Sequence, residues 1–249
     1  MDRSSAGPGD GLLTPPEMSV SMDFHTDCDA GNVLAMFIQS MALVGGSQYV
    51  ANFTAVYRDL LESYPEALTV LAEDWVWEKA HRPAPGRTVL RQFRRPIIAI
   101  ENGRPQIHFA RAFLLANNNH EDDVKASEPL SKTRPDALEA LTRSANIHAV
   151  RLDQQVGDMV FINNFGVLHA REQFVDSPTD PARRRHILRL QLHDTEFGWP
   201  SAQTLKRSLQ EQFAYAPSKH GLLTATEWMQ LPRANRTYAY GVDGYESHD

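Results

Sequence analysis

The triplet His25-Thr26-Asp27 combines two residue types that bind metal ions. In an extended chain, residues two positions apart point to the same face, so the imidazole of His25 and the carboxylate of Asp27 can reach one metal ion. A histidine and an aspartate at this spacing also occur by chance in surface turns, where they bind nothing. The triplet alone therefore leaves both interpretations open.

A distant segment supplies a further candidate ligand. His169 follows a Gly157-Asp158 turn signal and the β-rich run 159–162 (MVFI). Two imidazoles and one carboxylate form the facial triad typical of non-haem Fe(II) oxygenases, because it leaves coordination positions open for other ligands. His169, taken with the triplet at 25–27, thus indicates a candidate iron site.

Two arginines indicate an anion-binding site near the end of the same segment. Arg185 and Arg189 lie four residues apart on a predicted strand, so both guanidinium groups point to one face. Arginine can bind a carboxylate through two parallel hydrogen bonds. The spacing predicts a pocket that recognises carboxylates.

Four stretches of the chain together resemble the taurine dioxygenase (TauD/TfdA) family of Fe(II)- and 2-oxoglutarate-dependent dioxygenases. They are HTD at 25–27, GGSQ at 45–48, GDMVFINN and LHAR within 157–171, and RRHILR at 184–189. The resemblance extends from about Phe24 to about Asp194. It implies a mainly β or α+β fold, a double-stranded β-helix (a jelly-roll, cupin-like barrel) with flanking helices.

The resemblance also implies roles for individual residues. By it, His25, Asp27 and His169 are the ligands of Fe(II). Arg185 binds the distal carboxylate of 2-oxoglutarate, and Arg189 lies nearer the primary substrate or its anionic group. One coordination position is left for O₂.

Three further positions follow from the same resemblance. Asn164 matches a family asparagine on the strand that leads to the distal ligand, where it has a supporting role. Gln48 stands where the family often carries a threonine that helps to hold 2-oxoglutarate, and its amide can still donate a hydrogen bond. Arg184 is an alternative to Arg185, which we favour because its offset from Arg189 reproduces the family's R-x-x-x-R.

The implied activity is oxidation, most simply hydroxylation, of an unactivated C–H bond in a small, anionic molecule, with release of succinate and CO₂. Desaturation or ring formation could follow from the same chemistry. Two other hypotheses remain open: a degenerate barrel that only binds a ligand, and a zinc-type hydrolase that uses the same three ligands.

Hydrophobic patterning predicts the elements that position these residues. We expect a buried strand over 32–43, an amphipathic helix over 52–64 that ends at Pro65, and a hairpin of 95–100 with 105–115 around Asn102-Gly103. A surface loop follows at 117–132. A helix from Pro135 to Ile147, strands at 150–152, 159–162 and 186–192, and a helix over 202–215 complete the prediction.

Three other residues have a structural and a functional interpretation. Cys28 adjoins Asp27, yet neighbours on a strand alternate sides, so we expect its thiol to face away from the ligands. Trp75 and Trp77 could cover a substrate pocket, but core packing is the favoured interpretation.

Composition excludes several classes of function. The chain has 249 residues, 42% of them hydrophobic, with 25 basic and 31 acidic side chains and a net charge of −6. Mixed charges with an acidic sum disfavour nucleic-acid binding. Because no apolar run approaches the about 18–20 residues that cross a bilayer, and residues 1–24 lack a signal-peptide pattern, we expect a cytoplasmic protein.

The expected organisation is one irregular tail, 1–17, followed by a single TauD-like domain over 18–249. The family usually carries further structure before its metal triplet. The resemblance therefore leads us to expect either a trimmed chain or a barrel that lacks one edge and part of its substrate pocket. A homo-oligomer is compatible with the sequence.

Overall fold

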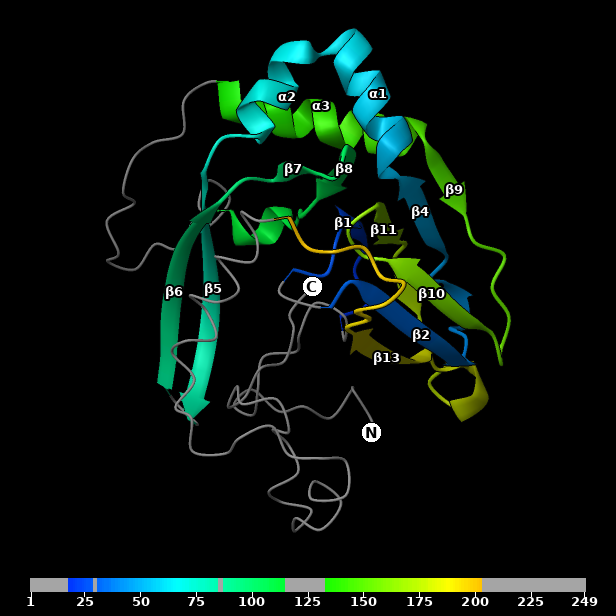
Figure 1. The fold of residues 1–249 in the computed structure, drawn as a ribbon. Coiled ribbons are helices and arrows are strands. Elements are labelled where there is room, and N and C mark those ends of the chain that lie inside the picture. The colour runs from blue at the N-terminus through cyan, green and yellow to red at the C-terminus, as the bar shows by residue number, and fades with distance from the viewer. Residues whose placement is uncertain (1–17, 29–30, 85–86, 115–132, 203–249) are drawn as a thin grey trace.

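The computed structural model describes residues 18–28, 31–84, 87–114 and 133–202 (Figure 1). Its strands are β1 (Met22–His25), β2 (Val33–Ser40), β3 (Val44–Gly45), β4 (Gln48–Asn52), β5 (Trp75–Ala84), β6 (Arg87–Arg95), β7 (Ile98–Glu101), β8 (Arg104–Ile107), β9 (Ala149–Arg151), β10 (Met159–Asn163), β11 (Val167–Arg171), β12 (Phe174–Val175) and β13 (His186–Leu192). Its helices are α1 (Phe53–Ser63), α2 (Pro65–Leu71) and α3 (Thr133–Ile147), with short 3-10 turns at Arg111–Phe113 and Pro181–Arg183.

Two antiparallel sheets form the centre of the molecule. The larger sheet has the strand order β1-β11-β4-β9, and the smaller sheet has the order β10-β2-β13. Neighbouring strands in both sheets come from distant parts of the chain. The larger sheet places His25 directly opposite His169, so its register alone brings two candidate ligands together.

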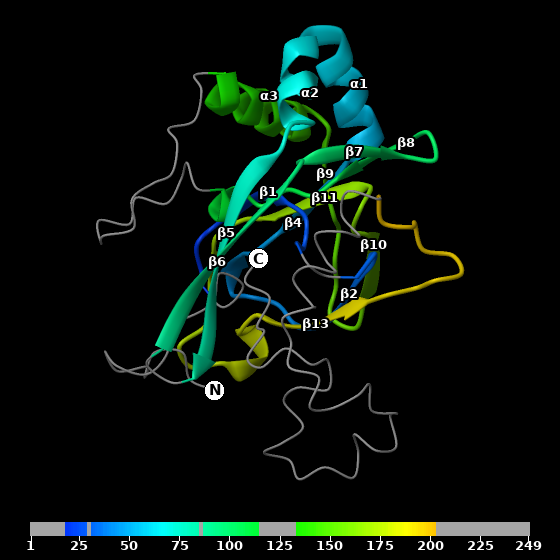
Figure 2. The same cartoon turned by 60° about the vertical axis from the view of Figure 1, so that its left-hand side comes forward.

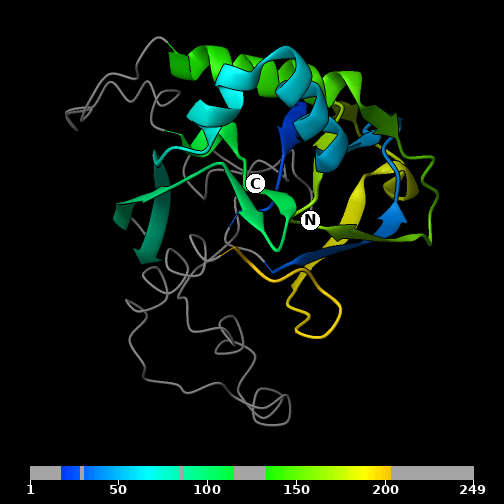
Figure 3. The same ribbon diagram turned by 45° about the horizontal axis from the view of Figure 1, so that its top comes forward.

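Helices α1, α2 and α3 cover one end of the molecule, whereas the β5–β6 hairpin extends away from them (Figures 1 and 2). Figure 3, with this end turned forward, shows the three helices lying together. Leu168 of β11 and Ala51 of β4 pack with α1 residues in the main core cluster. Because strand neighbours alternate sides, the residues beside Leu168, including His169, point to the opposite face, into the barrel.

Helix α1 confirms the helix predicted over 52–64. The Asn52 side chain accepts hydrogen bonds from the backbone N–H of Thr54 at 2.9 Å and of Ala55 at 3.4 Å, as a helix N-cap does. Among its apolar side chains, Phe53, Val56 and Leu60 are buried, whereas Leu61 is exposed.

The predicted hairpin is confirmed at β7 and β8. Asn102 and Gly103 both have positive φ, 50° and 72°. A two-residue turn that matches the right-handed twist of the flanking strands requires positive φ at both positions. The second strand ends at Ile107 rather than continuing to residue 115, because the following backbone changes partner. The N–H of Phe109 donates to the Thr26 hydroxyl at 2.9 Å, and the Phe109 carbonyl accepts from the Thr26 N–H at 2.6 Å.

The other predicted elements are confirmed where the structure describes them. The buried strand over 32–43 is β2, and the helix from Pro135 to Ile147 is α3. The strands at 150–152, 159–162 and 186–192 correspond to β9, β10 and β13. The tail 1–17, the loop 117–132 and nearly all of the helix over 202–215 lie outside the described residues.

The two tryptophans belong to the core, as the favoured interpretation held. Trp75 and Trp77 are almost fully buried in the main core cluster. Their indole N–H groups donate to the backbone carbonyls of Val70 and Arg95, each at 3.0 Å. Among the described residues, no helix has the length and apolar character needed to cross a membrane.

Candidate active site

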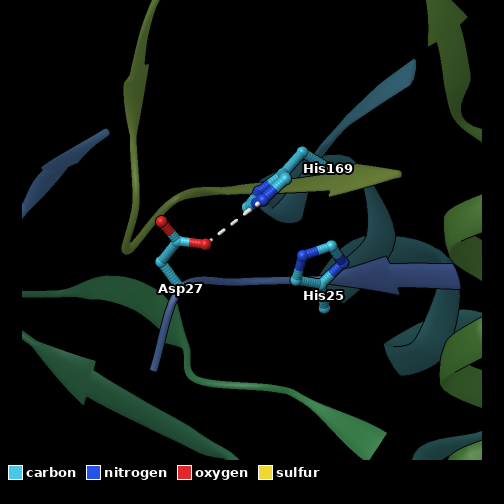
Figure 4. Close-up of side chains that lie close together, drawn as sticks. All are labelled: His25, Asp27 and His169. Atoms are coloured by element: carbon cyan, nitrogen blue, oxygen red, sulfur yellow. Dashed lines mark ion pairs between the residues drawn. The ribbon is translucent and has the colours of Figure 1, made fainter. Parts of the chain in front are cut away.

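His25, Asp27 and His169 converge at the end of β1 (Figure 4). The imidazole centroids of His25 and His169 are 4.2 Å apart, and His169 Nε2 lies 3.5 Å from Asp27 Oδ1. One ligand atom from each of the three residues lies within 4.8 Å of the others. A single metal ion could contact all three.

Thr26 fixes the backbone between the two N-terminal members of this group. It is fully buried, and its side chain and N–H are both bonded to Phe109. His25 and Asp27 therefore share the other face, as the triplet spacing predicts. Cys28 lies in the main core cluster with its thiol 3.5 Å from the Thr26 carbonyl, which confirms that it faces away from the ligands.

His25 is held in the form that binds a metal. Its Nδ1 lies 2.7 Å from the Asp23 carbonyl, so Nδ1 carries the proton and Nε2 keeps its lone pair. Burial, and after it the neighbouring His169, lowers the pKa of His25 from 6.5 to about 3. The buried Nε2 finds no hydrogen-bond partner among the described residues. A neutral imidazole with a buried, unpaired nitrogen fits a metal ion, and this donor set fits Fe(II).

Asn164 fixes the backbone of Asp27. Its Oδ1 accepts from the Asp27 N–H at 2.9 Å, and its Nδ2 donates to the carbonyls of Asp27 at 2.8 Å and of Gly31 at 3.0 Å. The side chain is fully buried, so these bonds satisfy groups that water cannot reach.

The carboxylate of Asp27 receives side chains from β13. Arg189 Nη1 lies 3.3 Å from Oδ1, and Gln191 Nε2 donates to Oδ2 at 3.0 Å. The carboxylate itself has no exposed surface. The sequence reasoning singled out Arg189 but missed Gln191. Its position two residues after Arg189, on the same face of the strand, is the signal that could have found it.

A pocket of about 280 Å³ lies between the two sheets beside these residues. Its lining comes from β1, β4 and β11 of the larger sheet (Met22, His25, Gln48, His169, Ala170, Arg171) and from β2 and the start of β13 in the smaller sheet (Met36, Arg185, His186, Ile187, Arg189). The structure thus brings the predicted Gln48, Arg185 and Arg189 into one cavity with the two imidazoles.

The comparison with known families identifies the chain's relatives. The model of the "Taurine catabolism dioxygenase TauD, TfdA family" matches residues 4–191. The chain belongs to this family. Among curated proteins, the taurine hydroxylase-like protein SAT17 of Stachybotrys chartarum is 28% identical over 206 residues, which are 83% of this chain and 51% of that protein. The chain therefore spans about half the length of this TauD/TfdA relative.

One of the solved structures that resemble the chain supports the fold. An asparagine oxygenase in complex with Fe(II), 3-hydroxyasparagine and succinate superposes with a TM-score of 0.51 and 16% identity, covering 75% of this chain and 54% of that one. The non-haem iron oxygenase OrfP in complex with Fe gives 0.48 and 15%, covering 70% and 51%. The double-stranded β-helix expected for a TauD/TfdA chain is the fold observed.

Arg185 and Arg184 have different surroundings in this TauD/TfdA chain. Arg184 donates from Nε to the Ser177 carbonyl at 3.0 Å and from Nη2 to the Pro178 carbonyl at 2.8 Å, so it holds a loop. Arg185 lies over the Phe174 ring, 5.4 Å from its centroid, and lines the pocket. Of the two candidates, Arg185 is the one whose side chain faces the cavity.

Gly46 makes room for the stem of Arg185. Its φ is +78°, and a Cβ built there would lie 3.4 Å from Arg185 Cδ and 3.2 Å from Phe174 Cβ. A larger residue would be strained by the backbone angle and crowded by Phe174, and it would reach van der Waals contact with Arg185. Gly46 therefore lets the Arg185 side chain lie close beside this turn.

Gln48 lies buried in the same pocket. Its Nε2 is 3.5 Å from Met36 Sδ, a weak acceptor, and its Oε1 has no partner among the described residues. Arg171 also lines the pocket, although sequence reasoning did not select it. Its Nη2 donates to the carbonyls of Met18 and Val20, at 2.7 and 2.6 Å, and so anchors the chain before β1.

Proposed function

We propose that this chain is an Fe(II)- and 2-oxoglutarate-dependent dioxygenase that hydroxylates a C–H bond of a small, anionic molecule. The observation that carries the proposal is the convergence of His25, Asp27 and His169, whose two imidazoles line a pocket that also contains Arg185. A metal site and a carboxylate-binding group within one cavity suit a cosubstrate that binds a metal at one end and carries a carboxylate at the other.

In this proposal His25, Asp27 and His169 hold Fe(II). Fe(II), with 2-oxoglutarate and O₂, supplies the oxidising power for the C–H bond, and succinate and CO₂ are the co-products. Burial of the ligand side chains keeps His25 neutral and shields the carboxylate of Asp27 from water. The protein thereby offers a preformed set of ligands that needs little rearrangement.

Arg185 and Gln48 bind the cosubstrate in this proposal. The Arg185 guanidinium pairs with the distal carboxylate of 2-oxoglutarate. Gln48 Nε2 exchanges its weak contact with Met36 Sδ for a carboxylate oxygen, a much stronger acceptor. The buried position of Gln48 supports this role, because a polar side chain inside a pocket is stabilised by a polar ligand.

Arg189 recognises the anionic group of the primary substrate. Its guanidinium is the pocket cation nearest Asp27, at 3.3 Å from Oδ1, so an anion bound there would lie beside the metal ligands. The name of the relative SAT17, taurine hydroxylase-like, supports a small substrate with an anionic group, because taurine carries a sulfonate.

The test is release of succinate from 2-oxoglutarate under air with added Fe(II), screened against a panel of small carboxylates and sulfonates. We expect a substrate that stimulates succinate formation in the wild type and no stimulation in His169→Ala. Binding of 2-oxoglutarate without any succinate across the panel would favour the ligand-binding barrel. Hydrolysis that depends on Zn²⁺ and not on O₂ would favour the hydrolase.

A further inference from the structure

The buried carboxylate of Asp27 is held from two directions. Asn164 binds its backbone N–H and carbonyl, and Gln191 donates to its Oδ2 at 3.0 Å. Backbone contacts fix where the side chain starts but leave rotation about its terminal bond open, and that rotation is broad for aspartate. The contact from Gln191 restricts this rotation.

The two oxygens of Asp27 have different neighbours. Oδ1 lies 3.5 Å from His169 Nε2 and 3.3 Å from Arg189 Nη1, whereas Oδ2 receives the shorter hydrogen bond from Gln191. Oδ1 is thus the oxygen turned toward the imidazole. A neutral amide at Oδ2 holds the carboxylate without adding a positive charge that would compete with a metal cation.

We infer that Gln191 is a positioning residue that orients Asp27 so that Oδ1 faces the metal site. This inference rests on the proposed function, because it assigns Gln191 a task at the iron site proposed above. Partners of metal ligands typically contribute about 10- to 100-fold to metal affinity.

The strand that carries Gln191 is well placed for this task. Within β13, Gln191 is paired with Leu34 of β2, which is almost fully buried. Alternate residues of β13 point outward, including Leu190 and Leu192, so Gln191 belongs to the face that lines the barrel. Paired backbone on one side and a buried acceptor on the other leave the amide little freedom.

The experiment measures the affinity of the metal-free protein for Co²⁺ by its visible absorption, which needs no turnover. We compare the wild type with Gln191→Met, which has a similar volume and no donor, and with Gln191→Asn, whose shorter amide is withdrawn from Oδ2. The matched control is Gln39→Met, which removes an exposed glutamine from β2 of the same sheet. Far-UV circular dichroism and thermal unfolding accompany each titration.

We expect Gln191→Met to raise the Kd for Co²⁺ by about 10- to 100-fold, Gln191→Asn to raise it in the same direction, and Gln39→Met to leave it unchanged. If Gln191→Met does not fold, Gln191→Asn decides. Variants that are less stable but bind Co²⁺ as the wild type does would overturn the inference alone, because Gln191 would then serve only the fold. A wild type that binds no Co²⁺ would overturn the proposed function as well.

Discussion

The two sheets that enclose the pocket contribute different chemistry. The larger sheet carries the imidazoles of His25 and His169, which are neutral donors suited to a metal ion. The smaller sheet carries Arg189 and Gln191, which donate hydrogen bonds to the Asp27 carboxylate, and Arg185 lines the pocket just before β13. A ligand variant in the larger sheet should therefore remove the metal, whereas an Arg185 variant beside the smaller sheet should spare the metal and weaken cosubstrate binding. Gln191 differs from Arg185, because we infer that it acts on the metal through Asp27.

Asp27 connects the two sheets. It follows β1 of the larger sheet, yet its carboxylate is held by Arg189 and Gln191 of β13. Asn164, which follows β10 of the smaller sheet, holds its backbone. The metal site is therefore complete only where both sheets are in place, and the predictions below separate their contributions.

The largest effect is expected from the larger sheet. His169→Ala removes one of three ligands and should abolish detectable Co²⁺ or Fe²⁺ binding while the secondary structure persists. His193→Ala, which removes an exposed imidazole, serves as the matched control. The measurement is metal titration of the metal-free protein. Retained affinity in His169→Ala would place the metal elsewhere.

In the smaller sheet, Arg185→Met should weaken 2-oxoglutarate binding at least about 10-fold and leave metal affinity nearly unchanged, because a charge-assisted hydrogen bond contributes about 1.5–3 kcal/mol. Arg184→Met should have little effect on 2-oxoglutarate, since its guanidinium binds loop carbonyls. The measurement is 2-oxoglutarate titration of the Fe(II) form under anaerobic conditions. The reverse order of effects would reassign the carboxylate site to Arg184.

Asn164, which holds the backbone of Asp27, should contribute to the stability of the protein. Asn164→Ala removes the hydrogen bonds of Asn164 to the buried N–H and carbonyl of Asp27, each worth about 1–3 kcal/mol, so the free energy of unfolding should fall by at least about 2 kcal/mol. Urea denaturation measures it. Asn146→Ala, on the exposed surface of α3, should change stability much less. Equal changes in the free energy of unfolding for Asn164→Ala and Asn146→Ala would show that Asn164 does not support the site.

The larger sheet should also produce a pH dependence of stability. The pKa of His25 is lowered from 6.5 to about 3, so between these values the unfolded chain binds a proton that the folded protein does not. The free energy of unfolding of the metal-free protein should therefore fall as the pH decreases from about 6.5 toward 3. His25→Gln should reduce this slope, measured by denaturation at several pH values. Identical slopes would mean that His25 is not buried as a neutral group.

Local sequence signals were sufficient for several elements and for the pairing of His25 with Asp27, but they predicted no strand over 75–95, where β5 and β6 lie. The Asn102-Gly103 turn, the amphipathic helix over 52–64 and the i, i+2 spacing of His25 and Asp27 each depend on neighbours within a few residues, and each is found in the structure. Family resemblance supplied the pairing with His169, which no local rule could.

The contacts that complete the site could not be predicted in this way. Gln191 and Asp27 are 164 residues apart, and their meeting depends on the register of β13, which shifts between His186 and Ile187. The early end of β8 has the same origin, because Phe109 bonds to the distant Thr26 instead of continuing the hairpin. Alternation within a strand predicts which face a residue occupies, but not its partner across the barrel.

One measurement tests most directly whether both sheets serve a single site: anaerobic titration of the metal-free protein with Fe(II) in the presence of 2-oxoglutarate. We expect a weak visible charge-transfer band that requires both components, disappears in His169→Ala and needs more 2-oxoglutarate in Arg185→Met. Absence of the band in the folded wild-type protein at saturating Fe(II) and 2-oxoglutarate would contradict a shared iron and 2-oxoglutarate site between the two sheets.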